Sequence, residues 1–117
     1  MAALPSISAE TFEAEVVEAS RERPVLVDFW GPRCGPCLKM MPWVERFAEE
    51  QGAGVAVVKV NAEENRRVSL RNRVMGLPTF ILFRDGKEAA RLSGDACTPA
   101  AVADLVQRYL AGAETRA

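Results

Sequence analysis

A chain of 117 residues with 49% hydrophobic and 26% charged residues has the size and composition of one globular domain. Its formal net charge of −1 argues for neither nucleic acid nor a membrane surface as a partner. Three cysteines are too few for a disulfide framework, and the absence of histidine excludes Cys–His and Ser–His catalytic pairs and histidine metal ligands.

The first half of the chain alternates predicted helices and strands. Ser8 can cap a first helix, which ends before Pro24 because the residue preceding a proline avoids the helical conformation. The hydrophobic patterns that follow predict a buried strand, a helix, a second buried strand and a short charged helix, at residues 25–30, 34–50, 55–60 and 63–71.

The second half begins with a predicted β-hairpin. Asp85-Gly86 is a strong turn signal, and it joins apolar or alternating runs at 79–83 and 87–93. A last helix follows, with Thr98 as its cap and Pro99 at its first position. We expect Gly112 to end this helix and leave a frayed tail at about 113–117.

Together these elements predict an α/β fold, with a mixed central sheet of four to five strands and helices on both faces. The fifth strand is an optional short one near Ile7. The whole chain, residues 1–117, forms a single predicted domain with its core at about 8–110.

The tetrapeptide Cys34-Gly35-Pro36-Cys37 lies at a predicted strand-to-helix junction. Residues three apart on a helix have Cβ atoms roughly 5–6 Å apart. A disulfide needs roughly 3.5–4.5 Å, so a small adjustment can open or close the bond. This geometry favours a reversible redox pair over two structural cysteines. A zinc site is the other alternative, but beside Cys97 it would need a carboxylate as fourth ligand.

Asp28 is a carboxylate in an otherwise apolar strand. Burial disfavours its charged form and raises its pKa, so Asp28 is a candidate proton acceptor for Cys37. The alternative is an acid at a strand end that reaches solvent.

Several segments fall in the order and spacing of one family. The chain resembles thioredoxin, from about Ser8 to Leu110, in Asp28-Phe29-Trp30, Cys34-Gly35-Pro36-Cys37, Gly76-Leu77-Pro78-Thr79, Asp85-Gly86-Lys87 and Gly94. The resemblance implies a thioredoxin fold and a protein-disulfide reductase whose redox-active centre is the CGPC motif. It also implies electron transport and a role in cell redox homeostasis.

The resemblance also assigns roles to residues. Cys34, at the start of a helix where orphan N–H groups favour a thiolate, is the expected nucleophile, and Cys37 is the resolving cysteine. Asp28 with its neighbour Lys59 completes the expected catalytic set. Pro78 resembles the cis-proline of the family. The expected substrate-binding surface is formed by Trp30, Arg33, Gly35, Pro36, Gly76, Leu77, Pro78 and Gly94.

The expected partners are disulfide-containing client proteins and a separate thioredoxin reductase, dependent on NADPH or ferredoxin. No GxGxxG fingerprint occurs, so we expect no bound cofactor, and we expect no bound metal. We expect a monomer that binds neither nucleic acid nor membrane. The first residues lack a signal-peptide pattern, which favours a reducing cytoplasm, with a secreted protein that has lost its leader as the alternative. A non-catalytic binding module that uses the same surface is the other candidate function.

Four features depart from the family pattern or extend it. Arg33 stands where many thioredoxins have an aromatic residue, and Leu38 where a basic residue is common; we expect Arg33 to favour the Cys34 thiolate and to change partner choice. Cys97 is expected to be a small, partly buried hydrophobe, with a regulatory thiol as the alternative. The remaining feature is a cluster of arginines, expected to be a solvated face or else a dock for an acidic reductase, at Arg66, Arg67, Arg71 and Arg73.

Overall fold

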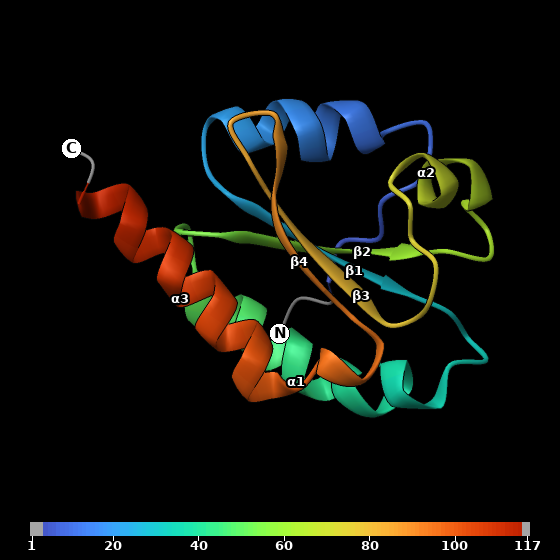
Figure 1. The fold of residues 1–117 in the computed structure, drawn as a ribbon. Helices are drawn as coiled ribbons and strands as arrows, with labels where there is room; N and C mark the ends of the chain where they lie inside the picture. Colours follow the sequence, from blue (N-terminus) through green and yellow to red (C-terminus); the bar gives the residue numbers. More distant parts are fainter. Residues whose placement is uncertain (1–3, 116–117) are drawn as a thin grey trace.

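A computed structural model, which describes residues 4–115, contains a mixed sheet between two layers of helices (Figure 1). The strands lie in the order β2-β1-β3-β4 and comprise Val25–Trp30 (β1), Ala56–Asn61 (β2), Thr79–Arg84 (β3) and Lys87–Ser93 (β4). The α-helices are Gly35–Gln51 (α1), Arg66–Arg71 (α2) and Pro99–Thr115 (α3). Shorter π- and 3₁₀-helical segments are Glu13–Glu18 (η1), Ala19–Arg21 (η2) and Gly94–Ala96 (η3). The predicted fold class is confirmed.

The sheet has parallel and antiparallel parts. β1 pairs in parallel with β2, to which α1 connects it, and antiparallel with β3, while β3 and β4 form the hairpin. In the parallel register Asp28 lies opposite Lys59. The optional strand near Ile7 is present only as one parallel bridge between Ser6 and Lys59. The sheet therefore has four strands and an added bridge at its β2 edge.

Each face of the sheet carries its own core (Figure 1). α1 and α3 cover one face, where Leu26 of β1 belongs to the same cluster as Val44 and Val102. η1 and α2 lie over the other face, where Val27 and Phe29 cluster with residues of both segments. Because successive strand residues point to opposite faces, Asp28 and Trp30 follow Leu26 onto the α1 side.

The turn between β3 and β4 confirms the predicted hairpin. Asp85 has φ +56° and Gly86 has φ +84°, and positive φ at both central residues is the type I′ geometry that matches the twist of paired strands. The N–H of Gly86 donates to the Ser20 hydroxyl at 2.9 Å, and that of Asp85 to the Ser20 carbonyl at 2.9 Å. The hairpin is therefore fixed to the segment that precedes β1.

The N-terminal cap prediction is wrong. The backbone N–H of Ser8 donates to the Thr11 hydroxyl at 3.3 Å, and the N–H of Thr11 donates back to the Ser8 carbonyl at 3.2 Å. Ser8 therefore closes a turn instead of capping a helix, and η1 begins only at Glu13.

Two other helix boundaries also differ from prediction. α2 begins at Arg66 because the Asn61 side-chain oxygen accepts the N–H groups of Glu63 and Glu64, at 3.0 and 3.3 Å, and holds them in a turn. α3 continues past Gly112 to Thr115, since a glycine inside a helix costs only about 1 kcal/mol relative to alanine. Residues 116–117 of the predicted tail lie outside the described residues.

Candidate active site

Cys34 and Cys37 form a disulfide where the chain leaves β1 and enters α1. Their Cα atoms are 5.3 Å apart. Cys34 is the N-cap of α1, with the extended backbone (φ −94°, ψ 104°) that this position favours, and Pro36 lies in the first turn. The sequence therefore places both sulfur atoms at the positive end of a 17-residue helix.

The two sulfur atoms have different surroundings. The backbone N–H of Cys37 donates to the Cys34 sulfur at 3.2 Å, so Cys34 caps the helix through its side chain. Cys34 is partly exposed, whereas Cys37 is only 2% exposed. A sulfur that accepts a helix N–H is the one on which negative charge is stabilised, and here it is also the one that a partner can reach.

Asp28 lies on the same face of the sheet and is 2% exposed. Its Oδ1 atom has no hydrogen-bond partner among the described residues. Burial raises the pKa of Asp28 to about 7, and the positive charge of Lys59 only partly opposes this rise. The predicted pKa shift of Asp28 is thus present in the folded chain, and the alternative of an acid that reaches solvent does not hold.

Lys59 and Trp30 lie close together beside Asp28. The Lys59 Nζ atom is 5.6 Å from the centre of the Trp30 ring, a cation–π distance. The buried Trp30 Nε1 has no hydrogen-bond partner among the described residues. Lys59 therefore influences Asp28 through its charge while its ammonium group lies over the indole.

The Leu77–Pro78 peptide bond is cis, as the family resemblance implies. The Pro78 carbonyl accepts the N–H of Gly94 at 2.8 Å and the thiol of Cys97 at 3.5 Å. A Cβ atom at Gly31 would lie 3.1 Å from Cδ1 of Leu77, so the segment before Pro78 packs against the loop that leads to Cys34. The structure thus brings the two halves of the predicted substrate surface together.

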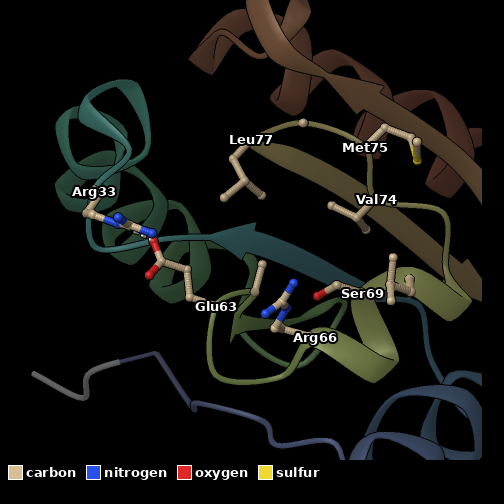
Figure 2. Close-up of a pocket in the computed structure, with 10 residues that line it drawn as sticks. Arg33, Glu63, Arg66, Ser69, Val74, Met75 and Leu77 are labelled. Carbon is tan, nitrogen blue, oxygen red and sulfur yellow. Dashed lines mark hydrogen bonds and ion pairs between the residues drawn. The ribbon is translucent and has the colours of Figure 1, made fainter.

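A groove of about 460 Å³ runs along this junction (Figure 2). Three of the predicted substrate-binding residues line it: Arg33, Gly76 and Leu77. Trp30, Gly35, Pro36, Pro78 and Gly94 lie outside its lining. Gly35 and Pro36 are exposed at the start of α1, and Pro78 is buried.

Two side chains that the sequence did not single out organise this region. Glu63 pairs with Arg33, with 3.2 Å between Oε2 and Nε. Arg91 donates to the backbone carbonyls of Asn72 and Arg73, at 2.7 and 3.1 Å, and so ties the loop after α2 to β4. The partners are 18 to 30 residues apart in the chain, so no local pattern could have indicated them.

The described residues also bear on cofactors and membranes. Among residues 4–115 no group of acidic and cysteine side chains is arranged to hold a metal ion. No helix in that range has the length and apolar character needed to cross a membrane. Cys97, at 9% exposure, belongs to the core beside α3, which makes it a small hydrophobe that is more deeply buried than expected.

Comparisons with known proteins agree with the geometry. The sequence model of the thioredoxin family matches residues 3–108. Thioredoxin 1 of Synechococcus elongatus is 36% identical over 110 residues, which are 94% of this chain and the whole of that protein. The thioredoxin of Synechocystis sp. is 34% identical with the same coverage. The chloroplastic thioredoxin Y of Oryza sativa is 40% identical over 87 residues, 73% of this chain and 51% of that protein.

Proposed function

The chain belongs to the thioredoxin family and is a dithiol–disulfide oxidoreductase, and from this premise we propose that it reduces client proteins through attack by Cys34 and resolution by Cys37. One observation carries this assignment: Cys34 caps α1 through its sulfur and is partly exposed, whereas Cys37 is buried one turn further on. A client disulfide can therefore reach Cys34 first.

Atoms and electrons are conserved between this protein and its client. The Cys34 thiolate attacks one client sulfur, a mixed disulfide forms, and the other client sulfur leaves as a thiolate that takes up a proton. Cys37 then loses its proton and attacks the Cys34 sulfur. The first client sulfur leaves, and two electrons have passed from the protein dithiol to the client, which leaves the Cys34–Cys37 disulfide.

Asp28 is the proposed acceptor of the Cys37 proton. A carboxylate with a pKa of about 7 is half ionised near neutral pH, which suits a general base at that pH. Lys59 is a positioning residue in this proposal, because its charge holds the pKa of Asp28 below the value that burial alone would give.

The client is proposed to dock as an extended segment beside Pro78. The Leu77 side chain lies near the loop that leads to Cys34, and we propose that the Leu77 backbone, just before the buried Pro78, pairs with a client strand. Trp30, Gly76 and Gly94 would supply the surface around this pairing, with Gly35 and Pro36 exposed beside Cys34.

The oxidised protein needs an external electron donor. We propose a thioredoxin reductase, dependent on NADPH or ferredoxin, because the mechanism uses only the chain's own dithiol and calls for no bound cofactor. We place the reaction in a reducing cytoplasm, where a CxxC pair can cycle between dithiol and disulfide.

Covalent trapping tests the assignment. A Cys37→Ser variant should accumulate mixed disulfides with client proteins on Cys34, since the resolving thiol is missing, and these adducts are identified by mass spectrometry after thiol quenching. A Cys34→Ser variant is the matched control and should trap none. Equal trapping by both variants would reverse or remove the proposed roles.

A further inference from the structure

The groove beside the Pro78 segment has an apolar wall and a polar wall (Figure 2). Val74, Met75 and Leu77 form the apolar wall. Two large hydrophobic residues of the groove lining are strongly exposed: Met75 at 89% and Leu70 at 71%. Apolar side chains gathered at an exposed groove mark a binding surface more often than isolated ones do.

The polar wall carries an unbalanced positive charge. It presents Arg33, Glu63 and Arg66, and the Arg33–Glu63 ion pair neutralises two of these charges. Arg66 makes no ion pair and no side-chain hydrogen bond within residues 4–115, and Figure 2 shows its guanidinium directed from α2 toward the space between Glu63 and Ser69. Counting partners among residues 4–115 only, Arg66 is an unpaired cation that faces the apolar wall across the groove.

The Glu63 carboxylate also lies close to the backbone of Gly31. A Cβ atom at Gly31 would lie 3.3 Å from the Glu63 carboxylate and 3.1 Å from Leu77. The absence of a side chain at residue 31 thus allows the Arg33–Glu63 pair to sit directly beside Leu77. Glu63 pairs with Arg33 here, and Arg66, which has no ion pair within residues 4–115, can meet an anionic group that enters the groove.

We propose that this groove selects client segments that carry a carboxylate side chain next to an apolar one, close to the cysteine under attack. Arg66 pairs with the carboxylate, and the apolar side chain covers Met75 and Leu77. The inference rests on the proposed reductase function and adds the class of client that it prefers. Charge complementarity between Arg66 and an acidic client segment is what commits the groove to this occupant.

Synthetic peptides test the selection. Each peptide contains one disulfide. The peptides differ at a single position, which carries Glu, Gln or Lys, and each position flanking the attacked cysteine is varied in turn. Single-turnover reduction by the pre-reduced protein excludes any effect of a reductase. At about 0.01 M salt we expect kcat/KM to fall in the order Glu, Gln, Lys, with Glu about threefold above Gln at the best position, because an exposed charge pair is weak. This preference should vanish at about 1 M salt.

Two variants with the same change of charge locate the effect. Arg66→Gln should remove the preference for Glu, whereas Arg67→Gln, on the same helix but outside the groove lining, should keep it. Met75→Ser should slow the reduction of all three peptides by a similar factor. A preference that survives Arg66→Gln, or one that both arginine variants abolish, would overturn the proposal.

The remaining outcomes separate this inference from the proposed function. If the wild-type protein reduces all peptides at one rate, the client preference is wrong and the reductase function stands. If it reduces none of them, nor any protein disulfide, the reductase function itself fails. A dimer in sedimentation experiments that Arg66→Gln dissociates would place a second copy in the groove and overturn the proposal.

Discussion

Cys34 and Cys97 both lie just before a helix on the same side of the sheet, yet their sulfur atoms are in opposite electrostatic situations. Cys34 is itself the N-cap of α1, and its sulfur accepts a backbone N–H. At α3 that position belongs to Thr98, whose hydroxyl accepts the N–H of Ala101 at 3.1 Å. Cys97, one residue earlier, instead donates its thiol to the Pro78 carbonyl. Proximity to a helix start is thus not enough to stabilise a thiolate; the sulfur must itself be the capping group.

Burial widens the difference between the two cysteines. Desolvation raises the pKa of Cys97 to about 11, with the nearby charge of Asp28 adding to the rise. At pH 7 roughly one Cys97 thiol in ten thousand is then ionised. The regulatory thiol considered for Cys97 is therefore disfavoured in the folded protein, while Cys34 has the surroundings of a reactive one.

The largest expected effect comes from removing each of the two cysteines in turn. Cys34→Ala should abolish reduction of protein disulfides, because no other described thiol is exposed and stabilised as a thiolate. Cys97→Ala should retain activity within about twofold, with a loss of stability of about 1 kcal/mol from the small cavity in the core. The turbidity of a reduced client measures the activity, and denaturant unfolding measures the stability. An active Cys34→Ala variant would contradict the assignment.

Asp28→Asn should stabilise the protein strongly at alkaline pH. Because the pKa of Asp28 is raised from 3.8 to about 7 by burial, the folded state holds this proton more tightly, and wild-type stability falls as pH rises from about 4 to about 7. Asparagine removes that penalty, so the free energy of unfolding at pH 8 should rise by roughly 4 kcal/mol.

At pH 3, below both pKa values of Asp28, Asp28→Asn should change stability little. The exposed Asp104→Asn is the matched control and should change it by less than about 0.5 kcal/mol at any pH. A gain in stability that does not depend on pH would assign the effect to packing instead of charge.

The same Asp28→Asn substitution should slow the second half of the reaction. Asparagine cannot accept the Cys37 proton, so release of client from the mixed disulfide should slow by about a hundredfold. The first attack by Cys34 should be nearly unchanged. Rapid-quench trapping of the mixed disulfide separates the two rates, and equal slowing of both would reject Asp28 as the base for Cys37.

The smallest effect concerns Arg33. Its side chain is 85% exposed and paired with Glu63, so its predicted support of the Cys34 thiolate is largely offset. Arg33→Gln should shift the alkylation of Cys34 slightly to higher pH, and Glu63→Gln, which frees Arg33, should shift it to lower pH. Shifts in the same direction for both variants would show that charge is not the cause.

Local sequence patterns were sufficient for most of the fold. The unbroken apolar run of β1 and the Asp85-Gly86 turn act through neighbouring residues, and both were predicted with nearly correct boundaries. The errors at Ser8 and Gly112 arose where two local preferences compete: the hydroxyl of Ser8 joins a turn with Thr11, and α3 tolerates an internal glycine.

The site was predictable only in part, because its geometry depends on contacts between distant segments. Cys34 and Cys37 carry their own signal at a helix start, and Asp28 is conspicuous as an acid in an apolar strand. The groove cannot be predicted from local sequence signals. It requires Glu63 to meet Arg33, and the segment before Pro78 to pack against Gly31. The cis form of the Leu77–Pro78 bond followed from family resemblance, since X–Pro bonds are cis in only about 5–6% of folded cases.

The most direct test compares the cysteines in one sample. The reduced protein is alkylated with iodoacetamide at about ten pH values between pH 5 and pH 10, and modification at each cysteine is followed by mass spectrometry. We expect Cys34 to react first, with a midpoint below that of an ordinary thiol, pKa about 8.5, while the buried Cys97, with a pKa of about 11, is modified far more slowly and only at the alkaline end of this range. Equal midpoints for Cys34 and Cys97, or a Cys34 midpoint no lower than that of an exposed thiol, would contradict the role of the α1 cap in ionising Cys34.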